Sequence, residues 1–143
     1  MKRSGSAVWQ GGLKDGAGTV STESGVLDAV SYSFSKRFGD EKGTNPEELV
    51  GAAHAACYSM QLSGVLTAAG TPPDEIATSA TVSGSMGDSG FSITDVHLTV
   101  EAKIPGADEA AFQAAAQKAK EICPISKLLN SSIDITLDAT LLP

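Results

Sequence analysis

The sequence has little of what most binding and metal-site classes need. Of its 143 residues two are cysteine, two are histidine and 5% are aromatic. Two cysteines are too few for a disulfide scaffold, and two histidines are too few for most histidine metal sites. With 10 Lys+Arg against 17 Asp+Glu, the formal net charge of −7 excludes a protein that follows a nucleic-acid backbone. The few aromatic residues predict an aliphatic core in which backbones approach closely.

The length and composition fit one folded domain. A chain of 143 residues has the size of a single domain, so we expect one domain over residues 1–143. Hydrophobic residues make up 41% of the chain, which excludes disorder over its whole length. The basic start is not followed by an apolar stretch of signal-peptide length, so we expect a cytoplasmic protein with reduced thiols.

The first third of the chain has the pattern of β-strands. We expect short strands over 6–10 and 17–23, joined by a glycine-rich connection with an Asp-Gly turn signal. From 30 to 34 apolar residues alternate with serines, which predicts a third strand with one apolar face. Arg37 is then expected at, or just past, the end of this strand.

A long helix is expected from Pro46 to about Ala69. Asn45 can cap its start, Pro46 suits the first helical position, and Glu48 stands where a capping box places its acid. No Asp, Glu, Lys or Arg lies between Glu48 and Asp74. Polar residues and glycines within this stretch argue against a transmembrane span, so we expect a central helix buried on all sides.

The second half of the chain alternates between strands and helices. We expect a strand over 76–86, a Gly-Asp-Ser-Gly turn, and a half-buried antiparallel strand over 96–104. A helix over 108–122 follows, ended by Pro124, and then a short helical turn over 126–131. Alternation from 133 to 141 predicts a last strand. This order of elements predicts an α+β fold with a largely antiparallel sheet.

The two cysteines are the remaining candidates for chemistry. The chain has no Cys-x-x-Cys or His-x-x-x-His pair for zinc, and its glycine-rich stretch lacks the Lys-Ser/Thr of a phosphate-binding loop. Cys57 falls in the middle of the long helix, and Cys123 falls at the end of the later helix, against Pro124. An equally open interpretation is that both are small core residues, the common fate of a free cysteine.

A reactive Cys57 needs a cation from elsewhere in the fold. At a rise of about 1.5 Å per residue it lies about 18 Å from the start of the helix, and the helix dipole fades within the first turn. Burial raises the pKa of a thiol further. Arg37 precedes the connection into this helix, although a solvated charge at a strand end is an alternative interpretation of it. Because Glu48 has the capping role, Glu47 is free to pair with an arginine.

Two segments of the chain resemble one known family. Residues 44–57 (TNPEELVGAAHAAC) resemble the signature of the osmotically inducible protein C / organic hydroperoxide resistance (OsmC/Ohr) family, and residues 122–127 (ICPISK) resemble its second-cysteine motif. Residues 31–38 look like the strand that carries the family's arginine, here Arg37. In the hydroperoxide-resistance branch the arginine is expected in the early loop, which here holds only Lys14. The resemblance covers essentially the whole chain and favours the osmotically inducible branch.

The resemblance implies a thiol-dependent peroxidase with an OsmC-like fold, in which sheets pack on a long central helix of an intertwined homodimer. Cys57 is then the peroxidatic cysteine that becomes a sulfenic acid, and Cys123 resolves it as a disulfide. Arg37 is expected to lower the Cys57 pKa and to hydrogen-bond the peroxide, held in place by Glu47. The implied partners are an organic hydroperoxide and a dithiol reductant on a lipoylated protein. No metal, organic cofactor, nucleic acid or membrane is implied.

Two other classes remain open at this point. One is a small-molecule-binding protein whose buried cysteines are inert. The other is a structural disulfide protein, in which a Cys57–Cys123 bond would close a loop of about 66 residues and contribute roughly 4 kcal/mol. A cytoplasmic location argues against such a permanent bond. His54 also keeps two interpretations, as a core histidine or as a catalytic one, and His97 is expected to be solvated on the polar face of its strand.

Overall fold

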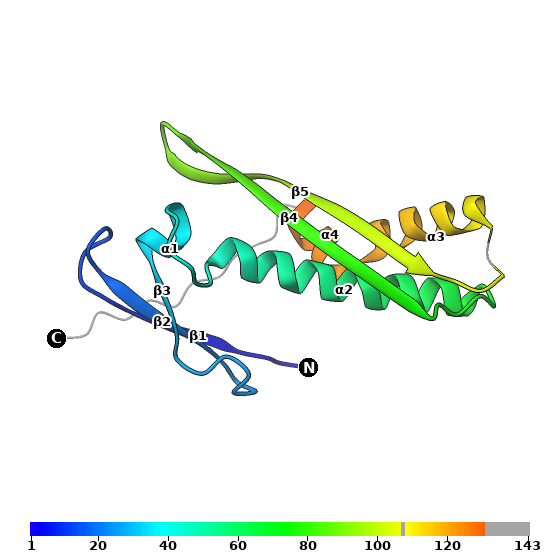
Figure 1. Ribbon diagram of the computed structural model, residues 1–143, viewed down its shortest axis with the longest axis horizontal. Coiled ribbons are helices and arrows are strands. Elements are labelled where there is room, and N and C mark those ends of the chain that lie inside the picture. The colour runs from blue at the N-terminus through cyan, green and yellow to red at the C-terminus, as the bar shows by residue number, and fades with distance from the viewer. Residues whose placement is uncertain (107, 131–143) are drawn as a thin grey trace. The chain divides into compact units, whose positions relative to one another are not determined.

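The computed structural model describes residues 1–106 and 108–130 of the chain. The elements in chain order are β1 (Gly5–Gln10), β2 (Ala17–Thr22), β3 (Val30–Ser33), α1 (Phe34–Phe38), α2 (Pro46–Ala68), β4 (Glu75–Gly87), β5 (Gly90–Lys103), α3 (Glu109–Ile122) and α4 (Pro124–Asn130) (Figure 1). The strand predicted over 133–141 lies outside the described residues. The chain divides into two compact units, Met1–Gly51 with Val82–Val96, and Ala52–Thr81 with the residues from His97 onward.

The first unit contains an antiparallel sheet in the order β1-β2-β3, as the alternating pattern predicts. Gly18 of β2 lies between Trp9 of β1 and Tyr32 of β3 in the register. Because glycine has no side chain, the two rings approach across it to a centroid distance of 5.3 Å. A Cβ atom at Gly18 would lie 2.7 Å from the Tyr32 ring and 2.8 Å from the Trp9 ring. This strand therefore requires glycine at position 18 for the two rings to meet.

The third strand is shorter than predicted, and this changes the setting of Arg37. β3 ends at Ser33, and the chain turns at once into the short helix α1, which carries Arg37. The Ser33 hydroxyl caps this helix by accepting a hydrogen bond from the amide of Lys36 at 3.2 Å. Arg37 therefore lies just past the end of the strand, which agrees with the prediction, but it lies in a helical turn that the pattern did not predict. The turn forms because a serine cap competes with the strand ladder.

Helix α2 begins and ends close to the predicted positions. The Asn45 side chain accepts a hydrogen bond from the amide of Glu48 at 2.8 Å, which confirms the predicted N-cap. After the helix, Gly70 adopts a left-handed backbone with φ of 82°, the conformation that glycine supplies at helix ends.

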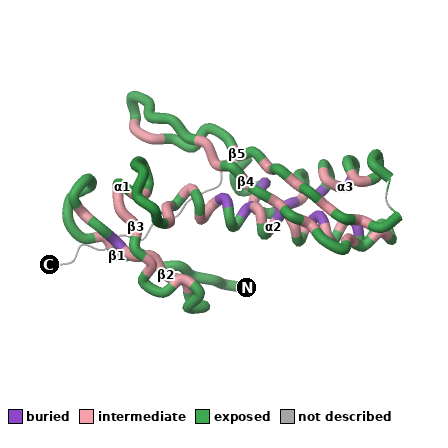
Figure 2. The backbone as a smooth tube through the Cα atoms, in the orientation of Figure 1, coloured by how far each residue is buried: buried purple, intermediate pink, exposed green. Residues whose placement is uncertain are grey.

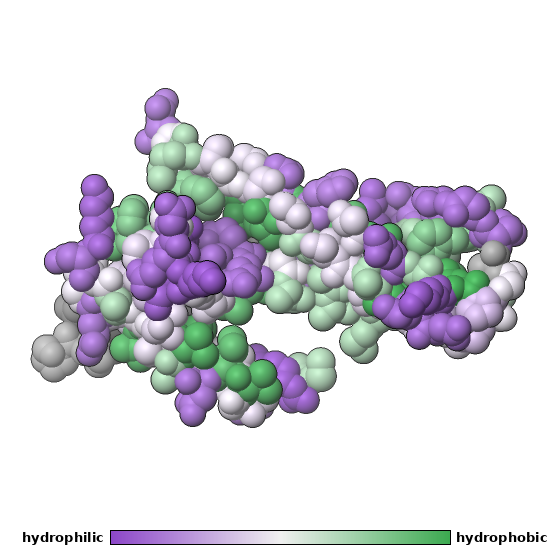
Figure 3. Space-filling view, in the orientation of Figure 1, coloured by the Kyte–Doolittle hydropathy of each residue, from purple (hydrophilic) through white to green (hydrophobic). Residues whose placement is uncertain are grey.

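The prediction that α2 is buried on all sides is wrong for the described chain. Its buried side chains form one stripe, namely His54, Tyr58, Leu62 and Leu66. The opposite stripe is exposed and consists of Ala52, Ala56, Met60, Gly64 and Ala68 (Figure 2). Both stripes repeat every four residues, which keeps each on one side of a helix. Along α2 the surface is coloured mostly white and pale green rather than purple (Figure 3).

The second unit holds the aliphatic core. Its buried apolar side chains are Tyr58, Leu62, Leu66, Ala115, Ala119 and Cys123, from α2, α3 and the turn after α3. The base of the β4-β5 hairpin covers this cluster with Ile76, Leu98, Val100 and Ile104. Ser59 of α2 also donates a hydrogen bond to the Thr78 hydroxyl of β4 at 2.7 Å. The two cysteine-bearing segments are thus fixed against one another by this core.

Candidate active site

The structure brings the two cysteines together in the second unit. The sulfurs of Cys57 in α2 and Cys123 after α3 lie 3.5 Å apart, although 66 residues separate them in the chain. Both thiols are free. A disulfide has an S–S length of about 2.05 Å, so closing one requires the sulfurs to approach by about 1.5 Å. Cys57 is half-buried, whereas Cys123 is fully buried.

Cys123 stands at the joint between two helices. Its amide donates to the carbonyl of Ala119 at 2.9 Å and ends α3, while its carbonyl accepts from the amide of Lys127 at 3.0 Å and begins α4. Pro124 occupies the first position of α4, where its missing amide proton costs nothing. Pro124 therefore ends α3, as predicted, and also starts the next helix. The backbone of Cys123 is held on both sides.

The environment acts differently on the two thiols. Burial raises the pKa of Cys57, and the nearby Cys123 raises it further, against a hydrogen bond from the Ile125 backbone. Burial also raises the pKa of Cys123, but hydrogen bonds from the amide and hydroxyl of Ser126, from Cys57 and from the Ile125 backbone outweigh it and lower that pKa overall. The direction for Cys57 agrees with the expectation that a thiol in mid-helix needs an added cation.

A second polar pair is buried beside the thiols. His54 and Ser126 are 4% and 3% exposed, and His54 Nε2 lies 2.8 Å from Ser126 Oγ. Burial lowers the pKa of His54, so the ring is neutral at pH 7. Its other nitrogen, Nδ1, is buried and has no hydrogen-bond partner among the described residues. Within the described part of the chain, only one of the two ring nitrogens of His54 is therefore hydrogen-bonded, and the structure does not decide between a core and a catalytic role for this residue.

The first unit holds the predicted arginine and glutamate as a pair. Arg37 donates from Nε to both Glu47 carboxylate oxygens, at 3.0 and 3.2 Å, and from Nη2 to Oε1 at 2.6 Å. The expected Arg37–Glu47 pairing is therefore present, and Glu48 remains exposed. The hydrogen bond from Arg37 lowers the pKa of Glu47 despite burial. The pair consequently stabilises the fold at pH values above the usual glutamate pKa. This stabilisation is lost as the pH falls through the lowered pKa of Glu47.

Aromatic rings surround this guanidinium. The carbon Cζ of Arg37 lies 4.8 Å from the centre of the Phe38 ring and 5.4 Å from that of Phe91. The residues Trp9, Leu13, Tyr32, Ser33, Phe34, Arg37 and Phe38 line a cavity of about 260 Å³. Sequence reasoning missed this cavity. The available signal was that five of the chain's seven aromatic residues lie in the strands and helix around Arg37 or on the β5 segment that contacts it.

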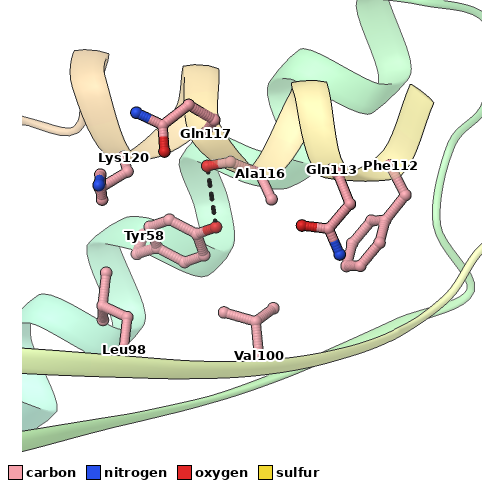
Figure 4. Close-up of a pocket in the computed structure, with 8 residues that line it drawn as sticks. All are labelled: Tyr58, Leu98, Val100, Phe112, Gln113, Ala116, Gln117 and Lys120. Carbon is pink, nitrogen blue, oxygen red and sulfur yellow. Dashed lines mark hydrogen bonds between the residues drawn. The ribbon is translucent and has the colours of Figure 1, made fainter. Parts of the chain in front are cut away.

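A separate cavity of about 270 Å³ lies in the second unit, between α2, α3 and β5 (Figure 4). The close-up shows Tyr58 pointing from α2 toward α3, where its hydroxyl donates to the Ala116 carbonyl at 3.1 Å. Leu98 and Val100 close the side formed by β5. Neither cysteine lines this cavity, so it does not form part of the thiol site.

Two further observations bear on what the site can hold. Within residues 1–106 and 108–130, no group of three or more His, Cys, Asp or Glu side chains could hold a metal ion. In the same part of the chain, no helix has the length and apolar character needed to cross a membrane. The Arg37–Glu47 pair belongs to the first unit, and the Cys57–Cys123 pair belongs to the second.

Known proteins match this chain over most of its length. A family described as OsmC-like protein matches residues 39–138. Peroxiredoxin OsmC of Escherichia coli (strain K12) is 52% identical over 138 residues, covering 96% of this chain and 95% of that protein. Organic hydroperoxide resistance protein OhrA of Bacillus subtilis (strain 168) is 33% identical over 102 residues, or 68% of each chain.

Solved structures match as well. An organic hydroperoxide resistance protein from Elizabethkingia anophelis has a TM-score of 0.71 at 27% identity, covering 94% of this chain and 93% of that one. An OsmC-like protein from Vibrio cholerae O1 biovar eltor has a TM-score of 0.70 at 17% identity, covering 92% and 95%, which bears on the fold alone. These matches confirm the predicted α+β fold class.

Proposed function

The chain belongs to the OsmC-like protein family, and on that premise we propose that it reduces organic hydroperoxides with Cys57 and Cys123. Its similarity to a peroxiredoxin and to organic hydroperoxide resistance proteins makes it a cysteine-based peroxidase, an oxidoreductase. The observation that carries the assignment to these two residues is the 3.5 Å separation of two free sulfurs from distant parts of the chain. Two inert core cysteines would not require such proximity.

Exposure supports a division of labour between the two thiols. Cys57 is half-buried and within reach of a small peroxide, whereas Cys123 is 0% exposed and within reach of Cys57. The Cys57 thiolate attacks one peroxide oxygen, the O–O bond breaks, and sulfur becomes a sulfenic acid. The departing alkoxide takes up the proton that the thiol gave up and leaves as the alcohol. Cys123 then displaces the sulfenic oxygen as water and forms the disulfide, which an external dithiol reduces.

Arg37 is the cation that we propose for Cys57. Its Nε and Nη2 atoms bind Glu47, and among the described residues no hydrogen bond engages Nη1. A guanidinium fixed in this way presents its remaining donors in a defined direction. Arg37 therefore lowers the Cys57 pKa and stabilises the charge that develops on the peroxide oxygen, either in its own subunit or in a partner subunit.

The cavity beside Arg37 supports an organic rather than an inorganic peroxide. Its lining is predominantly aromatic, with Trp9, Tyr32, Phe34 and Phe38 around one guanidinium. Apolar walls with a few polar groups, here Arg37 and Ser33, are typical of sites that bind a small organic molecule in a fixed orientation. The alkyl part of the substrate then lies against the rings, and its peroxide group faces Arg37.

Counting free thiols before and after one equivalent of an alkyl hydroperoxide tests the proposal. The reduced protein is expected to start with two titratable thiols and to lose both, because the sulfenic acid on Cys57 is resolved by Cys123. A binding protein with inert cysteines would keep both thiols. A structural disulfide protein would have none before treatment. Either outcome would contradict the proposed function.

The exposed stripe of α2 supports a homodimer. Ala52, Ala56, Met60, Gly64 and Ala68 form a charge-free surface of one exposed methionine among small residues, which lets a second backbone approach closely. We expect sedimentation at micromolar concentration to give a species of twice the 14.5 kDa chain mass. Replacing Gly64 with arginine should shift it toward the monomer, and a monomer in the unaltered protein would contradict the proposal. We further propose a cytoplasmic location, with a lipoylated protein as the dithiol reductant.

A further inference from the structure

The buried His54–Ser126 pair lies one helical turn from each reactive sulfur. His54 precedes Cys57 by three residues in α2, and Ser126 follows Cys123 by three residues in α4. Residues three apart share one face of a helix, which directs these side chains to the same side as the thiols. Burying polar side chains costs free energy unless they are hydrogen-bonded, and this pair is joined at 2.8 Å. The pair has no part in the mechanism described so far.

Ser126 connects His54 to Cys123. Ser126 stands three residues after Cys123, and hydrogen bonding from its amide and hydroxyl favours the charged form of the Cys123 sulfur. A hydroxyl has a single proton to donate, so its oxygen is free to accept from a donor on the other side. His54 Nε2 occupies that side at 2.8 Å. His54, Ser126 and Cys123 therefore form one hydrogen-bonded line, which leads from α2 to the Cys123 sulfur.

The proton of the His54 ring has a preferred place in this line. The ring is neutral and carries one proton, on either Nδ1 or Nε2. Nδ1 is buried without a partner among the described residues, and an unpaired buried N–H is rarer in proteins than an unpaired acceptor. The proton accordingly lies on Nε2, which donates to Ser126 Oγ. The Ser126 hydroxyl proton is then directed at the Cys123 sulfur.

We propose that His54 and Ser126 are positioning residues that hold Cys123 as a thiolate for the resolving step, an inference that rests on the proposed function. In that step the Cys123 sulfur attacks the sulfur of the Cys57 sulfenic acid, and the S–O bond breaks. The S–S bond forms, and the departing hydroxide takes up the proton that Cys123 released on ionisation and leaves as water. The peroxide has already oxidised the Cys57 sulfur by two electrons. The disulfide distributes this oxidation over both sulfurs, so no further oxidant is needed.

The other titratable groups near Cys123 do not stabilise its thiolate in place of His54 and Ser126. Burial raises the pKa of Tyr58 in α2, and the charge of Cys123 raises it further. Tyr58 therefore stays neutral. Its hydroxyl is also engaged by the Ala116 carbonyl. The Cys57 sulfur, 3.5 Å away, can hydrogen-bond the Cys123 thiolate only while it carries a thiol proton, which it no longer has once Cys57 is oxidised. During resolution, Ser126 is the side chain that still donates to Cys123.

A rapid-quench experiment with one equivalent of an alkyl hydroperoxide tests this inference. Sulfenic acid is trapped with a cyclic dione, and disulfide formation is followed by the loss of free thiols. His54→Leu and Ser126→Ala are expected to slow disulfide formation about tenfold, because one pKa unit is a tenfold change in the thiolate fraction. Trapped sulfenic acid should rise accordingly. His54→Gln and Ser126→Thr, which keep a donor and a hydroxyl, should restore most of the rate.

Ser59→Ala is the matched control, since it removes a hydrogen bond between α2 and β4 without touching the line to Cys123. It should leave both steps unchanged. Disulfide formation at the unaltered rate in a folded His54→Leu protein, as judged by circular dichroism, would overturn the inference.

A second measurement separates this inference from the proposed function. In a Cys57→Ser protein, the pH dependence of thiolate absorbance reports the pKa of Cys123 without any peroxide. Adding His54→Leu should raise that pKa by about one unit, and adding His54→Gln should change it little. If the unaltered chain consumes no peroxide, the proposed function fails while this titration still decides the role of His54. An identical titration curve for the leucine and glutamine variants would contradict it.

Discussion

Replacing Cys57 with serine is expected to abolish peroxide turnover, whereas replacing Cys123 with serine should leave one turnover intact. Cys57 is the half-buried sulfur, and a serine hydroxyl is not ionised at neutral pH and cannot attack the O–O bond. The Cys123→Ser protein still forms a sulfenic acid on Cys57, but no thiol lies beside it to resolve it. It should therefore consume one equivalent of peroxide and then stall or over-oxidise.

The difference between the two serine variants is measured as the peroxide consumed per subunit, and the mass of the oxidised protein shows how many oxygen atoms each variant has gained. The Cys123→Ser protein should gain one oxygen with one equivalent of peroxide and two or three with an excess. The Cys57→Ser protein is the control for the buried thiol and should remain unoxidised, because Cys123 is fully buried. If a folded Cys123→Ser protein consumes no peroxide and the Cys57→Ser protein does, the roles of the cysteines are reversed.

Removing the charge of Arg37 should raise the pKa of Cys57 by about one to three units, the range for loss of a close opposite charge. Burial and Cys123 already raise that pKa, so without a cation the thiolate is scarce at pH 7. Arg37→Met keeps the length of the side chain and removes the charge. Arg37→Lys should rescue activity only in part, because an ammonium cannot reproduce the two-point contact with the Glu47 carboxylate.

The pH dependence of Cys57 alkylation, measured in a Cys123→Ser background, isolates this effect because only one cysteine then titrates. Glu47→Gln should lower the single-turnover rate with peroxide by mispositioning Arg37. Glu48→Gln is the matched control on the same helical turn. It should change neither alkylation nor turnover, since Glu48 is exposed and the Asn45 cap uses its amide. Unchanged curves for Arg37→Met would mean that Cys57 is activated by another group.

The sequence could predict those parts of the fold that depend on short local patterns. The Asn45 cap, the end of α2 before Gly70 and the break at Pro124 each depend on a few neighbouring residues. The setting of Arg37 could not be predicted in this way, because alternation continues through residues 30–34 while the Ser33 cap ends the strand first. The pairing of Glu47 with Arg37 was predictable because both residues flank one short connection.

Contacts between distant segments of the chain were the harder part. The His54–Ser126 bond joins residues 72 positions apart, and neither position is unusual on its own helix. The cavity around Arg37 depends on β1, β3 and α1 meeting in three dimensions. The exposure of one face of α2 was also missed, because a charge-free helix gives no sign of which face its own chain leaves uncovered. Only the family resemblance linked Cys57 to Cys123 in advance.

The packing of Trp9 across Gly18 gives the protein an internal optical reporter. Trp9 is the one tryptophan of the sequence, so all indole fluorescence originates at this position. Its ring meets Tyr32 and lines the cavity that contains Arg37. Indole emission depends on the polarity around the ring, and filling the cavity replaces water with organic groups. The emission spectrum of the unlabelled protein therefore reports the contents of this cavity, while the thiol pair itself contributes no such signal.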